Sequence, residues 1–592
     1  MGNLSEQRNL VVAIVLSLAV LVGFQYFYEV PRVERQEAEE AARRAATGTE
    51  ETVMPAPATG RGAETLPAGA APTAPATVGE SENRSSALAR SPRLPIRNAR
   101  VHGSLPVVGR RIDDLILNDY KVTLAKDSPD ITLFSPQGAP KPYYAAFGWS
   151  SGDAELKVPD DDTVWQVSGS ELAPGRPVTL TWDNGQGLVF TRVVEIDENY
   201  LITVTQRAEN RGEKEVTLSP WGLIVRTDTP PTLGFFILHE GPIGVLEDES
   251  LKEIDYDDLE PDARLDKTYA STRGWLGITD KYWLVALVPD QAKGFTGGFR
   301  KRVSDSRDRY QVDYLASPVT VAAGASIDTS SRLFAGAKEV KLLDAYEDRF
   351  AIPLFDRAVD FGWFYFMTKP FFYVLDYFYR LLGNFGLAIL LLTVCVKLLF
   401  FPLANKSYKA MSKMKALQPK MVQLREKYGD DRQKLNQEMM ALYKNEKVNP
   451  ASGCLPILIQ IPVFFALYKV LFVTIEMRHA PFYGWIHDLS APDPLYILTG
   501  FGMFPWDVPH FLAIGIWPVL MGLTMFLQQR MNPQPADPVQ AKVFLFMPLF
   551  FIFLLGSFPA GLVIYWTWNN LLSMAQQYVI MRRMGVPIGG KT

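Results

Sequence analysis

A single lysine lies inside an apolar run of this sequence, where a cation is costly. Lys397 stands in the stretch TVCVKLLFFPL, residues 393–403, which continues an apolar run from residue 385. About 19 apolar residues are enough to cross a bilayer. An ammonium inside such a span costs at least about 2.5–3.5 kcal/mol on insertion scales. The retained charge therefore predicts either a functional role or a side chain that snorkels to the headgroups.

Polar residues at a comparable depth recur in the neighbouring apolar runs. Thr393 lies one helical turn before Lys397, so the two share a helix face. Polar groups inside a membrane usually face a protein interior or a wet cavity. We expect a cavity that is open to the cytoplasm and closed on the outer side. Residues that only hydrogen bond across helices are the alternative. The candidate cavity residues are Lys397, Thr393, Gln460, Thr524, Tyr565 and Asn569. Further polar residues that continue the same helix faces are Gln528, Ser573, Gln576 and Gln577.

Six apolar runs are long enough to cross a membrane as helices. The first, residues 10–28, ends in aromatic residues without a small-residue cleavage site. We therefore interpret residues 1–30 as an uncleaved signal-anchor span. The other five runs follow a large polar region and predict a five-span helical core over residues 385–592. These runs cover residues 385–403, 454–474, 511–528, 543–558 and 560–580.

The distribution of lysine and arginine around these runs predicts their orientation. The loop 405–449 holds eleven Lys and Arg residues against five Asp and Glu residues. The next loop on the same side and the C-terminal tail are also basic. Because basic loops stay in the cytoplasm, we expect both termini there and residues 31–384 largely on the opposite side.

The polar region before the core divides by composition. Residues 31–97 are rich in Ala, Pro, Glu, Thr and Gly, which predicts a flexible tether. Residues 98–350 contain short alternating runs separated by turn motifs such as Asp-Asn-Gly, as in a large antiparallel β-sandwich. Residues 351–384 are aromatic but interrupted by charges, which is typical of an amphipathic helix in the membrane interface. The expected fold class is a polytopic α-helical membrane protein with six spans and a large antiparallel β-sandwich domain.

Two further patterns belong to the predicted β domain. Residues 247–266 hold ten acidic residues, which favours a solvated loop, with a cation site as the alternative. The stretch LFAGAKEVKLLDAYED, residues 333–348, predicts a helix that closes the domain.

The basic loop 405–449 predicts an antiparallel helical hairpin. Two helix-period patterns are joined at Gly-Asp-Asp, residues 429–431. The exposed basic face suits anionic lipid, ribosomal RNA or an acidic protein. A loop that only fixes the topology through its positive charge agrees equally well with the pattern. The facing apolar positions are Met414, Leu417, Met421 and Leu424 in the first pattern and Leu435, Met439 and Leu442 in the second.

Composition argues against several classes of function. The chain has 592 residues and a net charge of −4, so no basic field points to DNA. Its two cysteines, Cys395 and Cys454, lie in apolar runs and leave no disulfide framework in the β domain. We identify no metal-ligand cluster, no cofactor motif and no nucleophile constellation. The expectation is a protein that is not an enzyme and needs no cofactor or metal.

Three long stretches of the sequence are specific: GDDRQKLNQEMMALYKNEKVNPASGCLPILIQIPVFFALYKVL, APFYGWIHDLSAPDPLYIL and FPAGLVIYWTWNNLLSMAQQY. They closely resemble the YidC family of membrane protein insertases. The resemblance extends over essentially the whole chain, including the anchor, tether and β domain of the Gram-negative type. It implies a protein of the bacterial inner membrane that receives nascent hydrophobic segments from the cytoplasm. Those segments are then released into the bilayer, by the insertase alone or with the Sec translocon.

The resemblance also implies a site. Family members have a hydrophilic groove, open to the cytoplasm and the lipid, with a cation in the second span. That cation is usually arginine, and Lys397 occupies the matching position. Lysine keeps the charge but lacks the planar five-donor fork. Thr393 and Gln460 match a groove threonine and a groove glutamine, and Trp566 stands where a substrate-contacting tyrosine is usual.

Partners and rival functions follow from the same comparison. The implied partners are nascent membrane proteins, the Sec translocon, anionic lipids, and the ribosome and signal recognition particle machinery through the hairpin. A polytopic transporter or channel is the alternative function, but we find no internal repeat or paired broken helices. An enzyme is a further rival, because the β domain resembles carbohydrate-mutarotase-like sandwiches. Only His102 and His239 lie in that domain, without a paired His and carboxylate motif.

Overall fold

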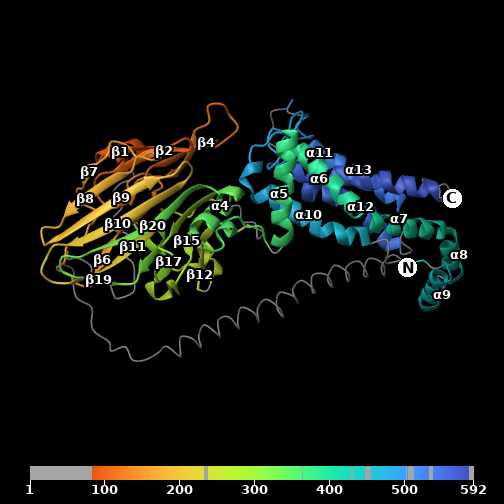
Figure 1. The fold of residues 1–592 in the computed structure, drawn as a ribbon. Coiled ribbons are helices and arrows are strands. Elements are labelled where there is room, and N and C mark those ends of the chain that lie inside the picture. The colour runs from red at the N-terminus through yellow and green to blue at the C-terminus, as the bar shows by residue number, and fades with distance from the viewer. Residues whose placement is uncertain are drawn as a thin grey trace.

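Figure 1 shows a sandwich domain of β-strands beside a helical domain, with helix α5 at the junction. The predicted signal anchor, residues 1–30, lies outside the described residues, as does most of the predicted tether. The computed structural model describes residues 83–585, with gaps at 233–237, 248, 363, 429–430, 447, 449–454, 502, 505–512 and 533–537.

Regular structure is present within the stretch predicted as a tether. Helix α3, Arg84–Leu88, is capped by the side chain of Asn83. Strand β1, Arg93–Arg97, pairs with β2, Val101–Pro106, in an antiparallel register. Ile96 of β1 is fully buried, an anchoring contact that the polar composition around it conceals. The C-terminal boundary of the predicted tether is therefore wrong.

Three antiparallel sheets build the sandwich domain, as the alternating sequence pattern predicts. Strand β10, Leu201–Asn210, shows the alternation: Ile202, Val204, Gln206 and Ala208 are buried, whereas Thr203, Thr205 and Arg207 between them are more exposed. Strands of the nine-stranded and seven-stranded sheets contribute to one hydrophobic core. This core fixes the register, because a shift by one residue turns every apolar side chain to the wrong face.

The order of the strands is known for each sheet. The four-stranded sheet has the order β1, β2, β4 (Leu115–Lys121) and β5 (Asp130–Phe134). The nine-stranded sheet has the order β13 (Ser250–Glu253), β12 (Gly241–Leu246), β15 (Trp275–Thr279), β16 (Trp283–Val288), β20 (Ser326–Ala337), β10, β9 (Leu188–Ile196), β8 (Val178–Asp183) and β7 (Gln166–Ser168). The seven-stranded sheet has the order β14 (Lys267–Ser271), β17 (Phe295–Ser304), β18 (Arg307–Ala316), β11 (Val216–Thr227), β6 (Tyr143–Ser151) and β3 (Arg111–Ile112), with β19 (Val319–Val321) paired to β11.

The helix predicted over residues 333–348 is only half correct. Strand β20 continues to Ala337, and helix α4 covers Val340–Phe350. Leu333 and Phe334 are fully buried between β10 and β16. Burial in the sheet thus overrides the helical pattern of the first five residues.

The acidic run 247–266 is more structured than a solvated loop. It contains β13 and two 3-10 helices, and Asp266 pairs with Arg302 at 2.6 Å. Within the described residues, no group of His, Cys, Asp and Glu side chains is placed to hold a metal ion. The 3-10 helices of the chain include η2 (Tyr256–Asp258), η3 (Ala263–Leu265), η4 (Phe355–Ala358) and η6 (Ile475–Met477).

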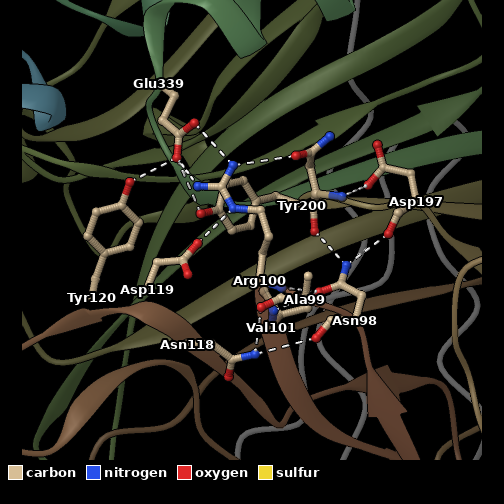
Figure 2. Close-up of polar contacts among 11 residues, drawn as sticks. Asn98, Ala99, Arg100, Val101, Asn118, Asp119, Tyr120, Asp197, Tyr200 and Glu339 are labelled. Atoms are coloured by element: carbon tan, nitrogen blue, oxygen red, sulfur yellow. Dashed lines mark hydrogen bonds and ion pairs between the residues drawn. The ribbon is translucent and has the colours of Figure 1, made fainter. Parts of the chain in front are cut away.

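A partly buried ion pair joins the four-stranded sheet to the start of α4 (Figure 2). Both terminal nitrogens of Arg100 donate to the carboxylate of Glu339, and its Nε donates to Asp119 at 2.8 Å. Tyr120 also donates to Glu339, at 2.8 Å. The guanidinium lies over the ring of Tyr200, 4.6 Å from its centroid. Because Glu339 precedes α4, this cluster fixes the point at which the chain leaves the sheets.

Helix α5, Tyr365–Leu382, lies within the predicted interfacial segment 351–384 and crosses the end of the helical domain (Figure 1). Lys369 pairs with Asp344 of α4 at 2.9 Å and with Asp356 at 2.6 Å. The charges that interrupt the apolar pattern therefore hold α5 to the sandwich domain. Its position in a membrane interface remains a prediction. Apolar side chains exposed on α5 include Phe366, Tyr377 and Leu381.

The helices of the helical domain largely coincide with the predicted apolar runs. Helix α13 is central to them, because it contacts α6, α7, α10 and α11. The helices are α6 (Phe385–Leu399), α7 (Phe401–Ala416), α10 (Leu455–Val473), α11 (Ile516–Met531), α12 (Pro538–Leu555) and α13 (Ala560–Arg583).

The predicted second span, residues 385–403, is not one straight helix. Helices α6 and α7 meet at Phe400 with a bend of 70°, and Pro402 lies in the first turn of α7, where a missing N–H is tolerated. Among the described helices, none alone combines the length and apolar character needed to cross a bilayer, but this bent pair does so together. The count of six spans therefore remains a prediction.

The predicted hairpin is present as α8, Gln418–Tyr428, packed against α9, Arg432–Asn445. Tyr443 of α9 donates to the sulfur of Met421 at 3.6 Å, so an inward-facing position of α8 contacts α9. The first helical pattern is broken into α7 and α8, because Pro419 cannot donate the hydrogen bond that would join them.

Three side chains beside the end of α10 attach the helical domain to the sandwich domain. Lys469 pairs with Asp360 at 2.8 Å. Glu476 Oε1 accepts a hydrogen bond from the backbone N–H of Val340 at 3.0 Å. Arg478 donates to a backbone carbonyl of β4 at 2.6 Å. The two domains therefore contact each other directly.

Candidate functional site

Helix α13 carries a row of polar side chains, each bonded to a different neighbouring helix. Gln460 of α10 donates to the hydroxyl of Tyr565. One and a half turns further along α13, Asn570 donates to Thr524 Oγ1 of α11 at 3.1 Å. The third bond, to α6, involves Lys397. This row is termed the polar ladder and consists of Gln460, Tyr565, Thr524, Asn570, Lys397 and Ser573.

The ammonium of Lys397 is directed at α13. Its Nζ donates to Ser573 Oγ at 2.7 Å, and Ser573 in turn donates to the carbonyl of Asn569 at 2.8 Å. The side chain therefore crosses to the neighbouring helix instead of running along its own helix to the headgroups. This geometry disfavours the snorkelling alternative.

Lys397 differs from two other partly buried lysines of the chain and resembles Lys338, which also donates to a hydroxyl, that of Thr279 at 2.8 Å. Lys369 and Lys469 each pair with an aspartate. Within the described residues, Lys397 has the serine hydroxyl as its polar partner and no carboxylate in ion-pair distance. An uncompensated positive charge is thus held between α6 and α13.

Thr393 is buried one turn before Lys397 but takes no part in the polar ladder. Its hydroxyl donates to the carbonyl of Ile389 in its own helix at 2.7 Å. Such a bond satisfies a threonine without a partner helix. The prediction that Thr393 shares a face with Lys397 agrees with the structure, and its role as a groove residue stays a prediction.

Asn569 shares a face of α13 with Tyr565 and Ser573, whereas Trp566 lies on another face. Asn569 is buried, and its side-chain oxygen accepts no hydrogen bond from the described residues. Trp566 is half-buried between α10 and α12, with ring centroids 4.6 Å from Phe464 and 5.7 Å from Phe551. It therefore lies apart from the polar ladder, although it follows Tyr565 directly in the sequence.

A second polar cluster lies where α11 ends. Gln577 of α13 donates to the carbonyl of Met531 at 3.2 Å and to Asn532 at 3.1 Å. Lys415 of α7 donates to the same Met531 carbonyl at 3.2 Å. A cation and an amide thus satisfy carbonyls that a helix end leaves free. This cluster ties α7 and α13 to α11 just beyond the polar ladder.

The sequence pattern misses one residue that the structure brings into these contacts. Ser573 and Gln577 follow Asn569 at intervals of four residues and belong to the polar stripe predicted from the sequence. Asn570 breaks that spacing and bonds to α11 from another face of α13. Only the packing of α11 reveals it.

Comparison with known proteins covers both domains. A family described as "60Kd inner membrane protein" matches residues 377–586, and one described as "YidC periplasmic domain" matches residues 93–374. The "Membrane protein insertase YidC" of Methylobacterium radiotolerans is 50% identical, over 99% of this chain and 96% of that protein. The protein of the same name from Methylorubrum extorquens is 52% identical, over 99% and 97%.

The matches agree with the architecture. The boundary between the two matched regions falls within α5, where the sandwich domain meets the helical domain. Membrane insertion is not an enzymatic reaction, and the alternative of a transporter or channel finds no support among these relatives. With the sandwich domain as its periplasmic part, the chain belongs to the YidC family of inner-membrane protein insertases.

Proposed function

We propose that the polar ladder receives the hydrophilic flank of an incoming membrane segment. The observation that carries this proposal is the half-buried ammonium of Lys397, which no described carboxylate neutralises. A charge between membrane helices is worth keeping only if something compensates it. The acidic tail of a client segment supplies that compensation when it enters.

In this proposal the same residues also shorten the dehydrated path that the client's polar tail must cross in the bilayer. Hydroxyl, amide and ammonium groups on α6, α10, α11 and α13 offer hydrogen bonds inside the bilayer. A polar tail that exchanges water for these groups loses less free energy than one that enters bare hydrocarbon. In this proposal the candidate groove residues are Lys397, Thr393, Gln460, Thr524, Tyr565, Trp566 and Asn569.

Release of the apolar segment is proposed to occur between α10 and α12. Trp566 lies between these two helices, and both carry exposed apolar side chains that face the surroundings. A client helix that slides along them stays in contact with protein until lipid replaces it. Exposed apolar residues on this path include Ile461 and Phe465 of α10 and Phe546, Phe550 and Phe553 of α12.

The cytoplasmic hairpin is proposed to bring the client to the ladder. Its basic face would meet ribosomes, the signal recognition particle machinery or anionic lipids. The Sec translocon is proposed as a further partner for clients that need both machines. The topology that fits this route has six spans and both termini in the cytoplasm.

Site-specific photo-crosslinking tests the proposed route. A crosslinker at Asn569 and another at Trp566 should both react with a single-span client on stalled ribosomes. A crosslinker at Leu523, on the exposed face of α11, is the matched control and should not react before release. Equal crosslinking from all three positions would contradict a defined path through the ladder.

A further inference from the structure

The segment between α10 and α11 ends in an apolar tip. Phe501, Met503 and Phe504 are exposed by 52%, 75% and 59%, and Ile497 by 38%. The stretch from Pro494 to Trp506 contains no charged residue. These four side chains, termed the tip cluster, therefore form an uncharged projection on a protein that otherwise exposes many charges outside its membrane helices.

The tip has a defined backbone. Gly500 N donates to the carbonyl of Ile497 at 3.0 Å, and Phe501 N donates to that of Tyr496 at 3.1 Å. Phe501 has a φ of 62°, a left-handed conformation that is unfavourable for an aromatic residue. Strain of this kind persists where the surrounding structure fixes it, and it often marks a functional position. Here the local hydrogen bonds hold Phe501 in that conformation, with half of its surface exposed.

The base of the tip is attached to the first turn of α11. Asp493 is buried, and its carboxylate accepts hydrogen bonds from Trp485 Nε1 at 2.9 Å and Trp517 N at 2.8 Å. Ile497 N donates to the carbonyl of Ile514 at 3.1 Å. The position of the tip relative to α11 is therefore determined by bonds on both sides of it.

The surroundings of the tip indicate what covers it. Leu520, Leu523 and Leu527 are exposed along one face of α11, at spacings of three and four residues. This stripe is suited to lipid, and the tip cluster is attached just where the stripe begins. Helix α5, with its own exposed apolar face, lies at the same end of the helical domain (Figure 1).

We propose that the tip cluster inserts into the leaflet that faces the sandwich domain, at the boundary between headgroups and acyl chains. Aromatic and aliphatic side chains without charge are stable at that depth. A binding site for a soluble protein would be expected to carry a polar or charged rim, which this stretch of the sequence lacks. Together with α5, the tip gives the helical domain two lateral contacts with the same leaflet.

Fluorescence quenching in lipid nanodiscs tests the proposal. The full chain with both native cysteines replaced by serine carries an environment-sensitive fluorophore at Met503→Cys. The matched control carries it at Lys214→Cys, which is exposed on the sandwich domain. A quencher on the lipid acyl chain should lower the emission at 503 by about twofold or more, at the depth expected for an interfacial segment, and leave 214 unchanged.

Two results would overturn the proposal. If aqueous iodide quenches the fluorophore at position 503 as strongly as the one at position 214, the tip cluster lies in water. Protection of 503 from both iodide and the lipid quencher would mean that protein covers it. Phe501→Gly serves as a second variant, because glycine accepts the left-handed backbone while removing the ring. It should reduce lipid quenching at 503 without lowering the amount of folded protein.

Discussion

At Lys397 an ammonium donates to a serine hydroxyl, whereas Lys369 and Lys469 each pair with an aspartate. Lysine loses its proton more readily than arginine when buried, and it cannot form a bidentate pair. A single flexible cation can, however, follow an acidic tail as it moves. Lys397 is therefore suited to neutralising the acidic tail of a client transiently. The effect of substituting Lys397 should accordingly depend on the charge of the client's tail.

We expect Lys397→Arg to keep insertion activity and Lys397→Glu to reduce it for clients with acidic translocated tails. A carboxylate between α6 and α13 would repel such tails in a medium of low effective dielectric. A tenfold loss, equivalent to about 1.4 kcal/mol, is the expected scale. The measurement is protease protection of a single-span client in proteoliposomes at matched abundance.

The control for the Lys397 variants is a client whose tail carries no acidic residues. Removal of the acidic residues from its tail should restore insertion by the Glu variant, whereas Lys397→Ala should fall between the Lys and Glu forms. Equal insertion by all of these variants would leave the cation without a role in recruitment.

Ser573→Ala is expected to show whether insertion depends on where the Lys397 ammonium is held, because the variant leaves the charge of Lys397 unchanged. The variant keeps Lys397 but removes its described acceptor on α13, a bond worth about 0.6 kcal/mol in a membrane. The freed side chain should turn toward the headgroups, so insertion of acidic-tail clients should fall while that of neutral-tail clients is unchanged. Ser573→Thr, which retains a hydroxyl, should restore the acidic-tail activity. A loss for both client types would indicate a structural role only.

Glu476 predicts a pH dependence at the domain contact, just beyond the end of α10. Burial of its carboxyl raises the pKa of Glu476 to about 8 from an ordinary value of 4.5. Between these values the folded protein holds a proton that the unfolded chain has released, so stability falls as pH rises through this window. Glu476→Gln keeps the acceptor for Val340 N and should remove this contribution.

The expected result is a difference that grows with pH. Melting temperatures of the two proteins in detergent should diverge from pH 5 to about pH 8, with the Gln form the more stable at the upper end. Lys338, whose pKa burial lowers to about 8, is present in both proteins and cancels in the comparison. Parallel melting curves across this range would contradict the assignment.

At the scale of elements, helix α9 of the hairpin begins with a side-chain cap. In the sequence Asp430 and Asp431 stand at the junction of the two helical patterns, and a position in a turn predicts that their substitution is mild. In the structure Asp431 caps α9, because its carboxylate accepts a hydrogen bond from Lys434 N at 3.0 Å. That expectation therefore needs revision for Asp431.

We expect Asp431→Ala to destabilise α9 by about 1 kcal/mol. Deletion of residues 406–447 should abolish insertion while the membrane helices still assemble. Amide hydrogen exchange of α9 measures the first effect, with Asp430→Ala as the control. Client insertion at a normal rate by the deletion variant would remove the hairpin from the pathway.

Helices and strands could be predicted from the sequence where burial and hydrophobic periodicity indicate the same element. Buried strands with alternate polar residues, such as β10, and long apolar helices such as α10 were placed from the sequence because burial and periodicity agree there. Prediction failed at β1, whose buried Ile96 stands among polar residues, and at the bend between α6 and α7. Both depend on contacts with distant parts of the chain. Pairing such as Asn570 with Thr524 is equally invisible without the packing of α11.

At the scale of the whole molecule, the tether and the pattern of the helical core are independent in the sequence, which predicts that the sandwich domain is largely dispensable for insertion. The structure adds direct contacts to that expectation, and they fall into two groups along the chain. Arg478 bonds to β4, which a deletion of residues 60–320 removes. Val340 and Asp360, which bond to Glu476 and Lys469, remain.

We therefore expect a chain without residues 60–320 to complement depletion of the native insertase but to melt at a lower temperature. The retained contacts of Val340 and Asp360 should keep α5 and α10 in place. Asp360→Ala in the full chain is the matched variant, and it should lower the melting temperature without removing the domain. Loss of growth at normal abundance of the shortened chain would show that the sandwich domain is needed for function.

The polar ladder has a consequence for how the helical domain opens. Its three bonds join α13 to α6, α10 and α11, and each is worth only about 0.6 kcal/mol in a membrane. Breaking all three therefore costs about 2 kcal/mol, so a few per cent of molecules have every bond open at any moment. Thermal motion alone then suffices to admit a client, and the entry rate scales with that open fraction. Each polar group on the arriving chain that takes over one of these bonds makes reclosure slower, so the client itself prolongs the opening.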